Sequence, residues 1–393
     1  MSSKWLSACV APMCVAVLAF VARPNRALMF SFGDALPGLT PAQEALFDAG
    51  LDEFLAAEEV DEGLGPVFNA RSCAACHSGP AVGGGSATLE TRFGRTNTDG
   101  SFDGMPGFGG SLIQSNGIGR VGACMYVGEL VPTQATIVAQ RRTTPLFGLG
   151  LVDAVTDADF VALAQKEASD PERTGGRVHM VTNIVEGQLR VGKFGWKAQV
   201  PSLFQFAGDA YLNEMGITNP QFPTENCPQG DCSLLACDPV AEPEDNGAGV
   251  QAFADFMKFL APPAGTTTAG ASAGQAIFSQ IGCAACHTPT LKTAPNAVTA
   301  LDKVVFHPYS DFLLHDMGAL GDGITQFQAT GREMRTAPLW GVSTQPLLLH
   351  DGRAPNVTAA ILAHDGQGRP ARDRFAALSA NAKAKLLAFL NSL

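Results

Sequence analysis

Apolar residues recur every three or four positions in several parts of this 393-residue chain, which is the spacing of amphipathic helices. The segment Pro41–Glu59 carries such a face, made of Leu46, Phe47, Leu51, Phe54 and Leu55. A second face, in Val250–Leu260, consists of Phe253, Phe256, Met257 and Leu260. Further helices are predicted at Ala158–Ala168, Val357–His364 and Ala371–Leu390. We therefore predict a mainly α fold, with short strands at most.

The N-terminus has a different pattern, an uninterrupted apolar run. Lys4 precedes the run Trp5–Ala22, and Arg23-Pro-Asn-Arg follows it. This arrangement is typical of a secretory signal, and we assign residues 1–28 to it. An uncleaved membrane anchor is the alternative, because the run is almost long enough to span a bilayer. We expect a periplasmic protein without stable membrane association once the signal is cleaved.

Candidate chemistry enters with the pentapeptide Cys-Ala-Ala-Cys-His, which occurs at Cys73–His77 and again at Cys283–His287. This spacing is the attachment signal of c-type haem. Cys73, Cys76, Cys283 and Cys286 would bond to porphyrin vinyl groups, and His77 and His287 would bind iron from the proximal side. Zinc is a poor alternative because four clustered ligands at finger-like spacing are missing. The sequence thus predicts two covalent haems.

The two attachment sites are related, since a Phe stands five residues before the first Cys of each, Phe68 and Phe278. We expect a short helix before each site, the second one at Ser272–Gln280. The Pro-, Gly- and Thr-rich segment 261–271 predicts a linker. It would separate an N-terminal cytochrome c-like domain, residues 40–260 and enlarged by loop insertions, from a C-terminal one, residues 272–393.

The net charge and the remaining cysteines limit the possible binding partners and the cellular compartment. The net charge is −11, which disfavours nucleic acid and would steer a neutral or basic redox partner to the surface. Outside the haem motifs and the signal, four cysteines remain: Cys124, Cys227, Cys232 and Cys237. In an oxidising compartment they predict two disulfides with three possible pairings, and free thiols are the alternative.

The far axial position of each haem decides its function. For the second haem, His364 is the best candidate, because it shares an apolar helical face with Val357 and Ile361. A core His without iron contact is the alternative. The rival ligands for this haem are His315, Met317 and Met334.

For the first haem, no His occurs between His77 and His179. Met105 and Met125 remain as possible ligands in that stretch, and His179 could fold back. We predict an open or weakly ligated iron here. Such an iron needs a nearby acid–base group and a route for electrons, and Glu214 and Trp196 are the candidates, although a solvated Glu and a core Trp are the common roles of such residues.

Several longer motifs complete a pattern that resembles the di-haem oxidoreductases of the peroxidase and thiol-oxidoreductase type. More distantly, the chain is similar to bacterial di-haem cytochrome c peroxidases and to the di-haem enzyme that matures methylamine dehydrogenase. The resemblance runs from about Glu44 to the C-terminus. It rests on the motifs Ser72–Pro80, Arg142–Ala154, Lys193–Ala198, Glu214–Thr218, Leu313–Gly318, Arg335–Val342 and Leu349–Ala354.

The resemblance implies a peroxidatic N-terminal haem, an electron-transfer C-terminal haem and often a calcium ion between the domains. It favours His364, fourteen residues after His350, as a second axial ligand, which suggests a bis-His haem of low potential. It also implies Trp196 between the haems and Glu214 as acid–base. The distal His that the peroxidases use at the first haem has no counterpart here, so the activation switch that depends on it is expected to be absent.

Together these observations predict an exported di-haem c-type oxidoreductase. Electrons from a small redox protein or a quinol-linked donor would enter at the C-terminal haem, and peroxide or a similar oxidant would react at the N-terminal haem. Two alternatives stay open. One is an electron-transfer protein with both irons six-coordinate, and the other is an enzyme that oxidises a protein or a thiol.

Overall fold

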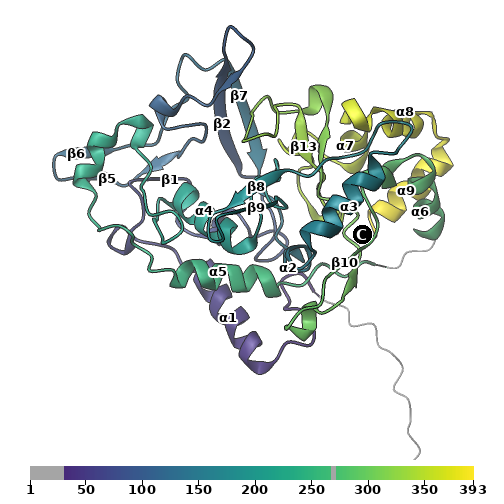
Figure 1. The fold of residues 1–393 in the computed structure, drawn as a ribbon, viewed down its shortest axis with the longest axis horizontal. Coiled ribbons are helices and arrows are strands. Elements are labelled where there is room, and N and C mark those ends of the chain that lie inside the picture. Colours follow the sequence, from purple (N-terminus) through teal and green to yellow (C-terminus); the bar gives the residue numbers. More distant parts are fainter. Residues whose placement is uncertain (1–30, 267–270) are drawn as a thin grey trace, which may run out of the picture.

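The computed structural model describes residues 31–266 and 271–393 (Figure 1). The predicted signal and residues 267–270 of the predicted linker lie outside the described residues. The α-helices are α1 Pro41–Leu55, α2 Leu149–Asp153, α3 Asp157–Glu167, α4 Leu203–Met215, α5 Ala248–Phe259, α6 Ala271–Gln280, α7 Val357–Ala363, α8 Arg369–Ala377 and α9 Ala380–Leu390. The strands are β1 Val67–Phe68, β2 Leu89–Thr96, β3 Phe102–Asp103, β4 Asn116–Gly117, β5 Gly119–Val121, β6 Cys124–Tyr126, β7 Ile137–Arg142, β8 Met180–Asn183, β9 Gln188–Val191, β10 Leu291–Lys292, β11 Val305–Phe306, β12 Leu314–Asp316 and β13 Glu333–Arg335.

The prediction of a mainly α fold is wrong, because the structure is 35% helical and 16% strand. The strands form six small antiparallel sheets rather than one layer. Most of them are two to four residues long, too short for an alternation of apolar and polar residues to be recognised in the sequence. The mixed architecture therefore arises from local strand pairs inserted between the helices.

The larger hydrophobic core is built around α1, α4 and α5, which lie together in Figure 1. Helix α1 begins at Thr40, whose side chain accepts from the Gln43 amide while the Gln43 side chain accepts from the Thr40 amide. This capping box satisfies two amides that the first turn cannot pair. Phe54 of α1 packs on Phe256 of α5, with ring centroids 4.7 Å apart. Phe47 and Phe54 of the predicted face of α1 thus pack against α5, whereas Leu46 and Leu55 of that face are each 48% exposed.

A smaller core joins α6, α8 and α9 at the other side of the molecule (Figure 1). It contains Phe278, Phe375 and Phe389, all nearly inaccessible to solvent. The sequence predicted a single closing helix over residues 371–390, whereas the structure has α8 and α9 with a break at Leu378. Ser379 causes the restart, because its side chain caps the first turn of α9 by accepting from the Ala382 amide.

Strand β2 pairs antiparallel with β7, so that Glu90 lies opposite Arg141. Arg141 reaches from this sheet into the C-terminal half, where its Nη2 lies 2.7 Å from Oδ2 of Asp322. Oδ1 of Asp322 also contacts Nζ of Lys197 at 2.8 Å. All three side chains are almost fully buried, so this ion cluster fixes β7 against the C-terminal part of the chain.

The segment 216–247 between α4 and α5 is held by the two disulfides that the sequence predicts. The pairings are Cys124–Cys237 and Cys227–Cys232, and the first of them ties β6 to this loop. Asp245 begins α5 by accepting from the amides of Gly247 and Gly249. In the two described stretches of the chain, no helix combines the length and the apolar character needed to cross a membrane.

Candidate active site

The first Cys-x-x-Cys-His motif forms a single turn of 3-10 helix, Cys73–Ala75, and a long segment separates this turn from the end of α1. Ser72 caps the turn by accepting from the Ala75 amide at 3.2 Å. Nδ1 of His77 lies 3.1 Å from the carbonyl oxygen of Gly84. Since a carbonyl only accepts, Nδ1 must carry the proton, and Nε2 keeps its lone pair.

The second motif repeats this geometry directly after α6. Its 3-10 turn is Cys283–Ala285, and Nδ1 of His287 lies 2.9 Å from the carbonyl oxygen of Tyr309. A Phe on the preceding helix meets each imidazole, at 6.0 Å for Phe54 with His77 and 6.4 Å for Phe278 with His287. The sequence predicted Phe68 as the counterpart of Phe278. Phe68 lies in β1 instead, so the structural counterpart of Phe278 is Phe54.

The residues of both motifs suit a haem. Each motif opens onto a cavity, and its two thiols and its imidazole line that cavity. Desolvation lowers the pKa of His77 and of His287 to about 4, so both rings are neutral at physiological pH. A neutral imidazole whose Nδ1 donates to a carbonyl is the arrangement that metal-binding histidines use. Cys73 and Cys283 are unpaired in the structure and free to form other bonds.

His364 lies across the second cavity from His287, with ring centroids 6.5 Å apart. It follows the last residue of α7, and its Nδ1 lies 2.8 Å from the carbonyl oxygen of Ala360. This bond leaves Nε2 of His364 with its lone pair, as at His287. Two metal–nitrogen bonds of about 2 Å each fit between the rings. The structure therefore brings together the two histidines that the sequence singled out for this haem.

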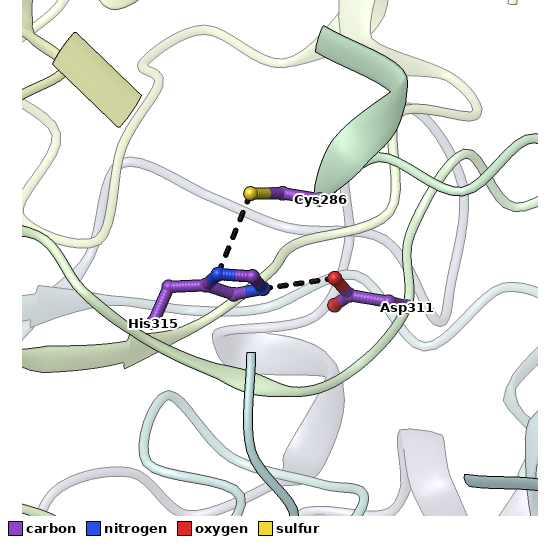
Figure 2. Close-up of side chains that lie close together, drawn as sticks. All are labelled: Cys286, Asp311 and His315. Atoms are coloured by element: carbon purple, nitrogen blue, oxygen red, sulfur yellow. Dashed lines mark hydrogen bonds and ion pairs between the residues drawn. The ribbon is translucent and has the colours of Figure 1, made fainter. Parts of the chain in front are cut away.

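His315 was a rival ligand, but both of its nitrogens are engaged (Figure 2). Nε2 lies 2.8 Å from Oδ2 of Asp311, and Nδ1 lies 3.0 Å from the carbonyl of Thr174 and 3.4 Å from Sγ of Cys286. Against desolvation, which lowers it, the Asp311 carboxylate raises the pKa of His315 well above its usual value. A protonated ring has no lone pair for iron. His315 instead holds the loop beside the attachment turn.

The methionine candidates differ in position. Met317 and Met334 line the same cavity as His364. Met105, the candidate for the first haem, is buried in a separate cluster with Phe93 and Ile113, and Met125 is exposed on β6. Neither lines the first cavity.

His179 was the other candidate for the first haem. It is buried, and its nitrogens face the carbonyl oxygen of Lys197 at 2.8 Å and Oε1 of Gln328 at 3.2 Å. It does not line the first cavity. The two methionines that do, Met215 and Met257, belong to the larger hydrophobic core.

Glu214 lines the first cavity at the C-terminal end of α4. Its Oε2 accepts from the Asn69 amide group at 2.8 Å, and the backbone carbonyl of Glu214 accepts from the amides of Asn69 and Ala70. Desolvation, followed by the negative charge of Glu90, raises the pKa of Glu214 to about 7. A carboxyl group with this pKa exchanges protons readily near neutral pH.

Five more charged groups line the same cavity, namely Glu90, Arg92, Arg141, Arg142 and Asp209, and sequence reasoning gave none of them a role there. Arg92 forms an ion pair with Glu90 at 2.9 Å, and although desolvation opposes it, this guanidinium lowers the pKa of Glu90. Desolvation raises the pKa of Asp209 to about 6. Glu90 and Arg92 share one face of β2 because they are two residues apart. This i, i+2 alternation was the only signal in the sequence, and it carries no information about which cavity the strand faces.

Trp196 lines both cavities. Its Nε1 donates to the carbonyl oxygen of Arg142 at 2.9 Å, and the guanidinium carbon of Arg142 lies 5.7 Å from the ring centroid. The ring of His350 packs against it edge to face at 6.2 Å. The indole is thus held rigidly in the wall that the two cavities share.

The chain is similar to a known protein family and to solved structures. A family model described as "Di-haem oxidoreductase, putative peroxidase" matches residues 128–393. Hydrazine synthase of Kuenenia stuttgartiensis, in a structure pressurised with xenon, aligns over 98% of this chain and 100% of its own, with 11% identity and a TM-score of 0.36. A MauG-like protein associated with microbial copper homeostasis aligns over 63% of this chain and 89% of its own, with 16% identity and a TM-score of 0.32. No curated protein matched the sequence.

Proposed function

Because this chain belongs to the di-haem oxidoreductase family, we propose that it is an exported peroxidase-like enzyme that reduces an oxidant at its N-terminal haem. The observation that carries the proposal is the asymmetry of the two cavities. The second places His364 opposite His287, whereas the first places ionisable groups, Glu214 among them, around His77. A protein that only carried electrons would not need a buried carboxyl group with a pKa near neutrality.

Covalent attachment of both haems belongs to this proposal. The support is the pair of Cys-x-x-Cys-His turns, each with two free thiols beside a neutral imidazole. Bound haem supplies an iron centre that accepts electrons one at a time and can bind peroxide oxygen. Attachment of haem to such motifs takes place outside the cytoplasm, which agrees with the predicted signal and a periplasmic location.

The residues of the first cavity would move the protons. Reduction of one peroxide molecule to two waters consumes two electrons and two protons. Glu214 would take the proton from one peroxide oxygen and return it to the other, and Asn69 would hold its carboxylate in place through the 2.8 Å hydrogen bond. Burial, followed by the negative charge of Glu90, would hold the pKa of Glu214 near 7, and the guanidinium of Arg92 would oppose this in part.

Electrons would enter at the cavity of His287 and His364 and reach the first cavity past Trp196. The position of the indole in the wall of both cavities supports this route. The donor would be a small redox protein or a quinol-linked carrier, and a neutral or basic docking surface would suit the net charge of −11.

The test is the substitution Glu214→Gln, which keeps the shape of the side chain and removes its proton exchange. We expect peroxide turnover to fall by about 10²–10⁴-fold at unchanged haem content. Glu186→Gln, at an exposed glutamate paired with Arg190, should leave turnover as it is. Equal turnover in Glu214→Gln and the unmodified protein would refute the acid–base role.

The spectrum of the oxidised protein separates an enzyme from an electron carrier. A high-spin band that disappears with cyanide is expected if one iron is accessible. Two low-spin irons that bind no cyanide would favour the electron-transfer alternative.

A further inference from the structure

Four carboxylates converge in the loop between α4 and α5, outside the lining of both haem cavities. They belong to Glu225, Asp238, Glu242 and Glu244, and one ligand oxygen of each lies within 4.8 Å of all the others. None of these residues lines either cavity. The two cystines hold the loop on which they stand.

The carboxylates lack the partners that buried acids need. Glu225 is only 6% exposed, and its Oε2 has no hydrogen-bond partner in the structure. Oδ2 of Asp238 and Oε1 of Glu244 are also buried without a partner. Within residues 31–266 and 271–393, no Lys, Arg or His forms an ion pair with any of the four acids. Glu225 is buried, Asp238 and Glu244 are half-buried and Glu242 is exposed. Holding four such groups together as like charges without a counter-charge is unfavourable, so the cluster favours a positive occupant.

The types of ligand atom in the cluster and the distances between them indicate which cation fits. Ca²⁺ binds six to eight oxygens at about 2.3–2.6 Å, so ligands on opposite sides of one ion are about 4.6–5.2 Å apart. Four oxygens that all lie within 4.8 Å of one another fit inside a single such shell. Zn²⁺ prefers nitrogen and sulfur ligands, and the cluster has none. Mg²⁺ usually keeps several waters and binds only one or two carboxylates.

We propose that Glu225, Asp238, Glu242 and Glu244 form a Ca²⁺ site that fastens the cystine-closed loop to the end of α4. Thr218, three residues after α4, contacts two of the acids. Its hydroxyl donates to Glu244 Oε2 at 2.6 Å and lies against Glu242, and its backbone amide also donates to Glu244 Oε2 at 2.6 Å. This site is separate from the calcium between domains that the family resemblance implies.

The site lies close to the proton-exchanging end of the first cavity. Nδ2 of Asn226, which follows Glu225, lies 3.4 Å from Oδ1 of Asn213 on α4. Asn213 lines the first cavity directly before Glu214. Occupation of the site would therefore order the segment that positions α4.

Calorimetry on the full haem-loaded protein, freed of cations with a chelator, tests the proposal. We expect one Ca²⁺ at this site in each chain, with a Kd below about 1 mM, the weak end of the range for calcium modules, and Mg²⁺ binding at least tenfold weaker. Glu225→Gln and Glu242→Gln should each weaken Ca²⁺ binding tenfold or more. Glu44→Gln, at an exposed acid on α1, is the matched control and should bind like the unmodified protein.

Absence of binding heat at millimolar Ca²⁺, or unchanged binding in both variants, would overturn the proposal. If the variants lose their native haem spectrum, hydrogen exchange on the unmodified protein decides. Ca²⁺ should slow amide exchange in residues 218–245, and protection confined to other segments would contradict the site. These measurements do not depend on turnover, so they separate a failure of the cation site from a failure of the peroxidase proposal.

Discussion

The side chain of Glu214 holds its proton to near neutral pH because it faces a cavity that also contains Glu90. Desolvation and the Glu90 charge both disfavour the ionised form, which raises the pKa of Glu214 to about 7. Asp209, with a pKa raised to about 6, sits on the preceding turn of α4. The chemistry of the cavity thus depends mainly on the burial of these carboxyl groups, which the guanidinium of Arg92 opposes only in part.

The pH dependence of turnover follows from the direction of this shift. Glu214 can accept a proton only when it is ionised, so kcat/KM for peroxide should rise as the pH increases through about 7 and fall below it. Glu214→Gln should lose this inflection while the haem spectrum stays unchanged over the same range. An inflection near pH 7 that persists in Glu214→Gln would assign the titration to another group.

The position of His364 leads to a prediction about the second haem. Replacing it by Met would turn the bis-His coordination expected for this haem into His–Met coordination, and a thioether ligand raises the reduction potential. We expect an increase on the order of a tenth of a volt, within the ~0.8 V range that axial ligands span. His307→Gln, at an exposed His bonded to Thr290, is the control for spectroelectrochemistry. An unaltered potential in His364→Met would show that His364 is not a ligand.

At the scale of elements, the cystines constrain the loop between α4 and α5 unequally. Cys124–Cys237 closes 113 residues, whereas Cys227–Cys232 closes five. The entropy lost by the unfolded chain grows with the length of the closed loop. The longer link should therefore contribute more to the free energy of unfolding.

Replacing both cysteines of a pair by Ser measures this difference. Removal of Cys124–Cys237 should lower the free energy of unfolding by about 5 kcal/mol, and removal of Cys227–Cys232 by about 2 kcal/mol. Urea unfolding followed by circular dichroism gives both values. Equal losses would indicate that residual structure in the unfolded chain, rather than loop closure, governs stability here.

Local signals in the sequence predicted the elements that carry the attachment sites. The helical spacing in residues 41–59 predicted α1. The spacing in residues 357–364 predicted α7 and put His364 on the apolar face of that helix. Non-local features could not be predicted in this way. Glu90 on β2 and Asp209 on α4 are far apart in the chain, and only the packing of the sheet against α4 brings them to one cavity. The role of Phe54 escaped prediction because an insertion separates α1 from Cys73.

For the whole molecule, the essential arrangement is two cavities with one shared wall. The ion cluster of Arg141, Lys197 and Asp322 anchors this wall from both halves of the chain. Trp196 is adjacent to Lys197 and reaches both cavities. In the proposed electron path, the two halves would therefore communicate through this buried segment.

Trp196→Phe tests whether electrons use this wall. Phe keeps an aromatic ring but loses the 2.9 Å bond to the Arg142 carbonyl. We expect turnover driven by an electron donor to fall about tenfold, which corresponds to about 1.4 kcal/mol of activation free energy. Trp340→Phe is the matched control, because Trp340 lines only the second cavity and its indole nitrogen has no partner. Equal rates in the two variants would exclude a special role for Trp196.

The guanidinium of Arg142 above Trp196 affects how electrons would cross the wall between the two cavities. An indole that gave up an electron would become a radical cation 5.7 Å from the guanidinium carbon of Arg142. Arg142 is bonded to two carbonyls and an amide oxygen and to no carboxylate, so the repulsion would be about 3 kcal/mol at an effective dielectric constant of about 20. This repulsion would make Trp196 hard to oxidise, so in the proposed electron path the indole would favour tunnelling between the two haems over stepwise hopping through a tryptophan radical.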